Sequence, residues 1–291
     1  MIRKKRKSKG IAKILSGLLV FGMVAGLVPA VPGGTVHAKA EGESEQNVTA
    51  EQHIHCICGT GKLSVEGHTH DEKQTWEGIS DLSKIIGEGY YYLTQDVTIY
   101  RAWKCPNDVT LCLNGHSITC DASEDVIVIN SGKTFTLTDC QENAGKITHN
   151  ESKTGRGICN NGTFYMYGGN IVGNTVTGPK YSSEYGKEYK GGGVCNYGTF
   201  YMYSGTISGN SFKVSANSDE GNYDYGYDYG YGYERHYSKF NGGGVYNNGT
   251  FVMTGGIISD NHADNDCGGG VYNNVNSKFD LSGSAVISNN K

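Results

Sequence analysis

A histidine- and cysteine-rich segment near the N-terminus carries the side chains best suited to chemistry. Thiolate sulfur and imidazole nitrogen are ligands that zinc prefers, and four of them complete a structural site. The segment offers His53, His55, Cys56, Cys58, His68 and His70. A subset such as Cys56, Cys58, His68 and His70 predicts a small structural zinc knuckle without a catalytic role, although this spacing matches no standard zinc finger.

Two other interpretations of this segment stay open. It can be an exposed histidine-rich leader, or its cysteines can be oxidised with other partners in an oxidising compartment. The chain has nine cysteines, and an odd number cannot all pair with one another. No cofactor is therefore assigned beyond this candidate zinc.

Tyrosine-rich stretches form a second group of candidate residues. Tyrosine supplies a broad amphipathic contact area, and neighbouring glycine and aspartate let a loop adapt its hydrogen bonds to a ligand. This composition indicates binding of carbohydrate or protein through Tyr181, Tyr185, Tyr223, Tyr225, Tyr227, Tyr229, Tyr231 and Tyr233. A disordered loop without a ligand explains the composition equally well. Metal binding by Asp219, Glu220, Asp224 and Asp228 is a weaker third interpretation.

The segments that must position these side chains belong to a sequence repeat. Phe164 alternates with Met166, and Phe251 with Met253, at the two-residue period of a strand. Asn-Gly and Gly-Gly pairs divide each copy into three short apolar runs that cannot bury their apolar faces alone. Stacked copies of such a unit predict a parallel β-helix with ladders of Phe, Ile, Met and Asn. The copies are Gly157 to Phe164, Gly193 to Phe200, Gly244 to Phe251 and Gly270 to Asn274.

Weaker copies of the same pattern lie upstream, around Val109 to Ile118 and Val128 to Leu137. In front of them, Ser80 to Gly87 carries an N-cap serine, apolar residues at helical spacing and a terminating glycine. This segment predicts a short helix that caps the N-terminal end of the solenoid. The expected fold is therefore all-β, a right-handed parallel β-helix with one capping helix.

The chain resembles the right-handed parallel β-helix, or pectate-lyase-like, proteins, and among them secreted surface proteins of Gram-positive bacteria with Gly-Gly-rich coils. Elements such as Gly242 to Val245 and Ile258 to Asn261 are also similar to repeats of polymorphic outer-membrane proteins. The resemblance covers roughly residues 90 to 291 and specifies fold more strongly than function.

Enzymes with this fold include pectate lyases and polygalacturonases, so the resemblance also raises catalysis. Such enzymes need clustered acids, and lyases need an Arg or Lys base. After the signal segment the only arginines are Arg101, Arg156 and Arg235. The remaining acid and base candidates, each more simply explained as a turn residue or a polar strand end, are His116, Asp121, Asp125 and Asp139.

The spacing between coils locates two insertions. From Phe135 onward the repeated phenylalanines are 29, 36, 51 and 28 residues apart. Both insertions, at residues 175–190 and 212–241, follow an Ile-x-x-Asn and precede a Gly-Gly-Gly, so they enter at the same corner of the coil. Neighbouring coils should project these two tyrosine-rich loops side by side, where a solenoid usually binds its ligand.

Residues 1–38 have the basic start, apolar stretch and small-residue cleavage site of a secretory signal. An uncleaved membrane anchor is the competing interpretation, and Pro29 and Pro32 break its apolar stretch. Of the 25 basic and 29 acidic residues, seven basic ones lie in this segment, so the remainder has a formal charge of −11. That charge argues against nucleic acid and anionic membrane as partners.

These observations predict a signal peptide at 1–38, a flexible leader with the metal knuckle at 39–75, and a β-helix at 76–291. We expect a secreted or cell-surface, non-catalytic module for adhesion that binds a glycan or a host or cell-surface protein, with no membrane span after signal cleavage. The alternative is a polysaccharide-active lyase or glycoside hydrolase of the same fold.

Overall fold

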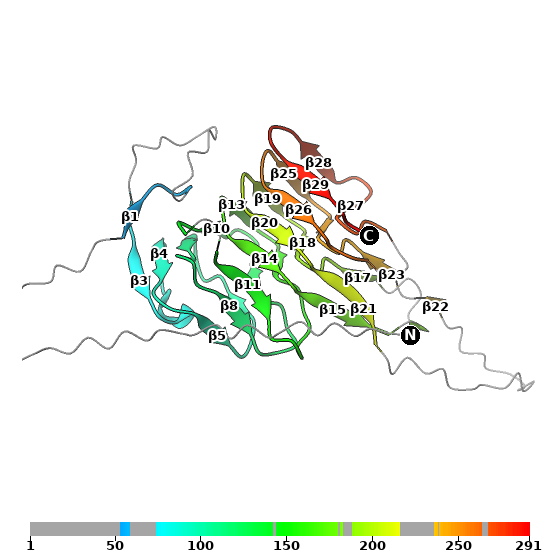
Figure 1. Cartoon of the computed structure of the whole chain (residues 1–291), viewed down its shortest axis with the longest axis horizontal. Coiled ribbons are helices and arrows are strands. Elements are labelled where there is room, and N and C mark those ends of the chain that lie inside the picture. Colours follow the sequence, from blue (N-terminus) through cyan, green and yellow to red (C-terminus); the bar gives the residue numbers. More distant parts are fainter. Residues whose placement is uncertain are drawn as a thin grey trace, which may run out of the picture. The chain divides into compact units, whose positions relative to one another are not determined.

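A computed structural model of the chain describes residues 53–58, 74–141, 144–179, 181–182, 188–215, 236–237, 239–263 and 267–291. Three parallel sheets run the length of this part, and successive coils follow one another from cyan to red in Figure 1. Each complete coil contributes one strand to each sheet. The protein is therefore an all-β parallel solenoid.

The first sheet has eight strands and the longest pairings. Its strands are β3 (Glu77–Ile79), β4 (Gly89–Leu93), β7 (Val109–Cys112), β10 (Thr134–Thr138), β13 (Thr163–Met166), β19 (Thr199–Met202), β25 (Thr250–Met253) and β28 (Lys278–Leu281).

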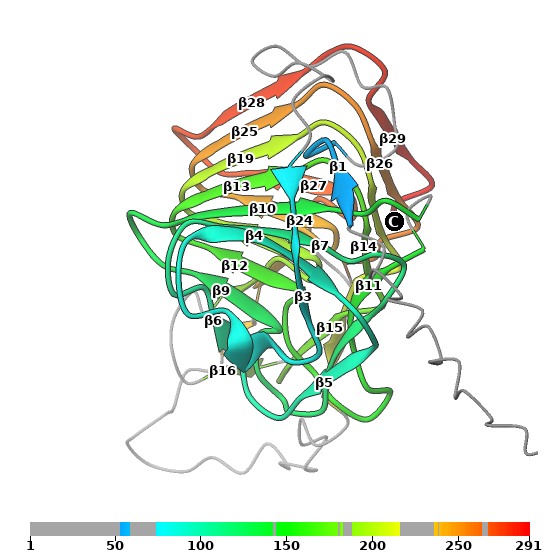
Figure 2. The same cartoon turned by 90° about the vertical axis from the view of Figure 1, so that its left-hand side faces the viewer.

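The second sheet has seven strands and the third has six. The second contains β5 (Val97–Ile99), β8 (Ile118–Cys120), β11 (Lys146–His149), β14 (Asn170–Val172), β20 (Thr206–Ser208), β26 (Ile257–Ser259) and β29 (Val286–Ser288). The third contains β6 (Trp103–Lys104), β9 (Ile127–Ile129), β12 (Ile158–Asn160), β18 (Val194–Asn196), β24 (Val245–Asn247) and β27 (Val271–Asn273). Figure 2, which views the described coils from the β1 and β3 side, shows the chain passing from sheet to sheet around a common interior.

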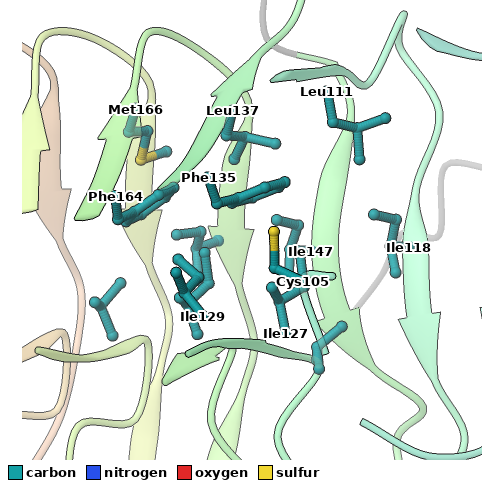
Figure 3. Packing of buried hydrophobic residues seen from close by; sticks show 14 of the residues in the cluster. Cys105, Leu111, Ile118, Ile127, Ile129, Phe135, Leu137, Ile147, Phe164 and Met166 are labelled. Atoms are coloured by element: carbon teal, nitrogen blue, oxygen red, sulfur yellow. The ribbon is translucent and has the colours of Figure 1, made fainter. Parts of the chain in front are cut away.

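Ladders of identical side chains fill that interior, because equivalent residues of successive coils are in register. Phe164 stacks on Phe200 with 4.7 Å between ring centroids, and Phe200 stacks on Phe251 at 4.6 Å. All three rings are fully buried. Figure 3 shows the start of this ladder, with Phe135 beside Phe164 and aliphatic side chains around them. The core is thus a continuous column between the sheets.

Two rows of asparagines satisfy the polar groups at the turns. In each row the amide Nδ2 of one asparagine donates to Oδ1 of the next, at distances from 2.6 to 3.0 Å. The asparagine ladder expected from the repeats is therefore present twice. The rows are Asn160, Asn196, Asn247 and Asn273 on the third sheet, and Asn174, Asn210, Asn261 and Asn290 after the second sheet.

The helix expected at Ser80 to Gly87 is reduced to one 3-10 turn, Leu82–Lys84. Its N-cap is Asp81 rather than Ser80, since the Asp81 carboxylate accepts a 2.7 Å hydrogen bond from the backbone N–H of Ser83. Leu82 and Ile85 are buried in the main apolar core, while Ile86 is exposed. A single turn is enough to place the Leu82 and Ile85 side chains in the core, and the chain then continues into β4.

Candidate functional site

Two open hollows lie along the corner where the chain passes from the second sheet to the third. The first has a volume of about 730 Å³ and is lined by Tyr100, Arg101, Trp103 and Glu124 among others. The second, of about 470 Å³, shares Glu124 and Ala102 and adds Asp125, Arg156 and Tyr189. These residues come from the same corner of successive coils. The hollows therefore follow one another along the solenoid.

Charged side chains hold the wall of the second hollow in place. The Arg156 guanidinium lies 3.1 Å from the Asp125 carboxylate, which also accepts a hydrogen bond from the Arg156 backbone N–H. Glu124 accepts a 2.9 Å hydrogen bond from the backbone N–H of Ala102 and thereby links two coils. The hollow thus offers a cation, two carboxylates and the ring of Tyr189 to a ligand.

The two insertions leave the solenoid at this same corner and pair with each other. β15 (Thr175–Gly178) pairs with β21 (Ser211–Val214), β16 (Tyr181–Ser182) with β22 (His236–Tyr237), and β17 (Glu188–Lys190) with β23 (Lys239–Asn241). Phe212 is fully buried in a small apolar cluster of its own with Ala263, Val176, Tyr189 and Val214. We call these three strand pairs the stalk. The stalk is a packed extension of the solenoid.

The predicted tyrosine contacts fall mostly outside the described residues. Only the backbone of Tyr181 is placed, in β16 of the stalk. The other predicted binding residues of these loops lie outside the described part of the chain, and they are Tyr185, Tyr223, Tyr225, Tyr227, Tyr229, Tyr231 and Tyr233.

Tyrosines also gather on the outer face of the first sheet, where no binding residues were predicted from the sequence. Tyr165 stacks on Tyr201 at 5.0 Å, and Tyr167 stacks on Tyr203 at 4.8 Å. Tyr167 is buried under Cys56, Ile57 and Cys58, and the other three rings are half-buried. In the sequence, Tyr165 and Tyr167 alternate with the inward-facing Phe164 and Met166, and this pattern indicates that the two tyrosines face outward.

Further along the same outer face, four potential metal ligands converge. One nitrogen or sulfur atom from each of His53, His55, Cys112 and Cys140 lies within 4.8 Å of the others. We call them the histidine–cysteine cluster. His53 and His55 belong to the leader, whose strand β1 (Ile54–His55) pairs antiparallel with β2 (Gln74–Thr75). Cys112 ends β7, and Cys140 follows β10. The cluster therefore joins the leader to two coils of the solenoid.

Aromatic rings and backbone groups hold the two imidazoles in place. His53 stacks on Tyr92 with 4.0 Å between centroids, and His55 stacks on Trp76 at 4.3 Å. The indole of Trp76 donates a 3.1 Å hydrogen bond to the carbonyl of His55. His55 Nδ1 donates a 2.6 Å hydrogen bond to the carbonyl oxygen of Cys56. His55 Nε2 lies 2.9 Å from Nε2 of His53.

The turns after the two strands set the positions of the cysteines. Asn114 and Gly115 follow Cys112 with left-handed φ angles of 50° and 78°. The Asp139 carboxylate accepts hydrogen bonds from the backbone N–H groups of Gly115, Gln141 and Gly145. The thiol of Cys140 donates to Asn114 Oδ1 at 3.3 Å. A buried carboxylate thus ties together the two turns that carry the thiols.

Electrostatics within the cluster favour a thiolate at Cys140. The hydrogen bond with Cys112 lowers the pKa of the Cys140 thiol, and His55 and His53 lower it further against the opposing effect of burial. The same hydrogen bond and burial raise the pKa of Cys112. Burial lowers the pKa of His53. Neutral imidazole and thiolate are the forms in which these side chains bind metal.

The structure brings together only part of the predicted ligand set. His53 and His55 join the cluster, whereas Cys56 and Cys58 pack against Tyr167 with 3.3 Å between their sulfur atoms. His68 and His70 lie outside the described residues. Cys112 and Cys140 were missed as ligands. The sequence pattern could have indicated Cys112, because it follows the inward-facing Leu111 in an alternating strand and therefore points outward.

The acid and base candidates for catalysis serve the turns. His116 lies 3.4 Å from Asp96, and Asp121 lies 3.9 Å from the Lys153 ammonium. The Asp139 carboxylate accepts hydrogen bonds from backbone N–H groups, as described above. Each of these carboxylates therefore has a local structural role.

No protein-family model, curated protein or solved structure matches this chain. Among the described residues, the structure has no helix long and apolar enough to cross a membrane.

Proposed function

We propose that the protein is a secreted or cell-surface module that binds an extended carbohydrate or protein ligand without transforming it. The observation that carries the proposal is the coincidence of three features at one corner: two successive hollows and the paired bases of both insertions. An elongated ligand can run along the corner and reach the tyrosine-rich segments that the stalk carries.

The lining of the corner supports this proposal. Trp103 and Tyr189 offer aromatic surface, and Arg101, Glu124 and Arg156 offer hydrogen-bonding groups. Binding sites commonly combine apolar rings with a few well-placed polar groups. Packing of Phe212 in the stalk favours a base that holds its shape, which lowers the entropic cost of ordering a binding loop.

The proposal includes a finer fold type. The coil length, the three-sheet cross-section and the Asn ladders agree with a right-handed solenoid of the pectate-lyase-like kind. Leu82 and Ile85, which are buried at the end near β3 and β4, are proposed to close that end of the core.

Binding can be measured on a glycan array and with immobilised bacterial and host cell-surface protein fractions, alongside a polyuronide cleavage assay. Replacement of Tyr225, Tyr227, Tyr229 and Tyr231 by Ser should abolish binding, and Trp103→Ala should weaken it. The matched control is Tyr165→Ser with Tyr201→Ser, which removes tyrosines from a different face and should leave binding unchanged.

Circular dichroism must show the same β-rich spectrum for all variants. Retained binding in the four-tyrosine variant together with loss in the Tyr165 and Tyr201 control would move the site to the outer face of the first sheet. Cleavage of a polyuronide would instead favour the alternative, a polysaccharide-active enzyme.

A further inference from the structure

We propose that His53, His55, Cys112 and Cys140 form a tetrahedral zinc site that fastens the leader to the outer face of the first sheet. This inference is independent of the binding function proposed above, because none of the four residues lies at the corner or in the stalk.

The spacing of the ligand atoms fits a tetrahedral ion. Zinc lies about 2.0–2.1 Å from imidazole nitrogen and about 2.3 Å from thiolate sulfur, so neighbouring ligand atoms around it are roughly 3.3–3.8 Å apart. The two Nε2 atoms are 2.9 Å apart, and Cys140 Sγ is 3.7 Å from His53 Nε2. With all four atoms inside 4.8 Å, small side-chain rotations complete the geometry.

The groups around the four ligands are those that orient a metal site. The carbonyl of Cys56 accepts from His55 Nδ1 and so directs Nε2 toward the cluster, an arrangement typical of metal-bound histidine. Trp76 and Tyr92 pack against the imidazoles and, with the buried Cys112 and Cys140, form an apolar cluster. Thr138, the strand partner of Cys112, has the one buried hydroxyl that lacks a hydrogen-bond partner among the described residues.

The donor set selects the metal. Two thiolates and two neutral imidazoles in a closed, four-coordinate site are typical of structural zinc, whereas oxygen-rich sites suit calcium or magnesium. The ion binds both cysteines as thiolates, so binding competes with protonation of the thiols and weakens at acid pH. No position is left for water or substrate, and the site is therefore structural.

Fastening the leader has a structural consequence. Apart from the metal ligands, β1 is held by its two-residue pairing with β2, by hydrogen bonds to Trp76 and by the ring contacts already described. A two-stranded pairing of this size is marginal in water. Zinc bound by both the leader and the solenoid would keep the leader over Tyr92, Cys112 and Tyr167.

The test uses the full secreted chain, purified under reducing conditions without a histidine tag. Elemental analysis should find about one zinc per chain. Cobalt should replace it and give the absorption of a tetrahedral thiolate site. The stoichiometry should fall below roughly a tenth of that value in a His53→Asn, His55→Asn variant, which leaves the solenoid core untouched, and in a Cys112→Ser, Cys140→Ser variant.

Two matched variants keep the test specific. Cys56→Ser with Cys58→Ser, and Cys159→Ser with Cys195→Ser, remove the same number of thiols and should retain the zinc. Chelation should expose the leader to protease in the wild-type chain, while the solenoid survives.

Three outcomes would overturn the proposal. They are absence of stoichiometric zinc in reduced, zinc-supplemented protein, loss of zinc from the Cys56 and Cys58 variant with retention in the Cys112 and Cys140 variant, and a Cys112–Cys140 disulfide in the protein as secreted. The histidine variant keeps the test decisive if the cysteine variant fails to fold.

Discussion

The coils from β12 onward and the coils that precede it solve the same packing problem in different ways. From β12 onward, identical inward-facing residues stack on one another, as Phe200 and Met202 do with their counterparts in both neighbouring strands. Before β12, the outward positions of the first sheet carry Tyr92, Cys112 and Thr138, and leader residues His53 and His55 lie against the first two. Repetition positions the backbone, whereas departures from it place reactive side chains together.

The cysteines show the same difference. Cys159 and Cys195 are strand partners within the repetitive coils, and burial raises the pKa of both thiols. Cys140 is as buried as Cys159, at 9% exposure each, yet its pKa is lowered by its neighbours. Burial alone makes a thiol inert, and convergent partners reverse that effect.

The largest effect is expected from breaking the ladder in the repetitive coils. Phe200→Ala removes a fully buried ring that stacks on both sides, and such a truncation costs about 3–5 kcal/mol of unfolding free energy. Phe279→Ala, in the last coil with a half-buried ring, should cost less than half as much. Urea denaturation measures both, and equal losses would contradict the ladder model.

The next effect concerns the asparagine rows. Asn210→Ala removes the acceptor of the Asn174 backbone N–H and one acceptor of its Nδ2, and it removes the side-chain donor to Asn261 Oδ1 and to the carbonyl of Ile171, in a buried place. We expect a loss of about 2–3 kcal/mol of unfolding free energy.

Asn290→Ala is the matched control for Asn210→Ala. It ends the same row at a partly exposed position where water can replace the side chain, so its cost should stay below about 1 kcal/mol. A loss at Asn290 as large as that at Asn210 would show that burial does not set the cost.

A smaller effect separates the two kinds of thiol. Because burial raises the pKa of Cys159 to about 11, its thiolate fraction, and with it the rate of iodoacetamide labelling, should rise about tenfold per pH unit between about pH 7 and 9. Zinc should leave that rate unchanged and should protect Cys112 and Cys140. Peptide mass spectrometry reads each site, and zinc-dependent labelling of Cys159 would remove the distinction.

The smallest effect should follow from shortening the second insertion. Deletion of Asp219 to Arg235 removes no described residue, and loop length changes the closure entropy little. The thermal midpoint should therefore stay within a few degrees of wild type, equivalent to less than about 1 kcal/mol. A large drop would mean that this segment stabilises the stalk.

Periodicity made most of the fold predictable. The alternation of Phe251 and Met253 predicted inward-facing strands, and the repeated Asn predicted a ladder at the turns. The helix at Ser80 to Gly87 was overestimated, because an N-cap and apolar spacing describe a single 3-10 turn equally well.

The cluster was half predictable for a physical reason. His53 and His55 attract attention by their composition, but the partners Cys112 and Cys140 are distant in sequence and are brought together by the return of the chain after one coil. Contact between such residues depends on the register of whole coils, which a local motif does not contain.

The asparagine rows also give the solenoid a direction. Within each row, every amide-to-amide hydrogen bond runs from Nδ2 of one asparagine to Oδ1 of the next one toward the C-terminus, and Oδ1 of Asn174 accepts from Nδ1 of His149. Rotating one amide by half a turn would set oxygen against oxygen on one side and NH₂ against NH₂ on the other. Each row therefore behaves as a chain of aligned dipoles whose members keep one another in orientation, and polarity set at one end passes along the whole column.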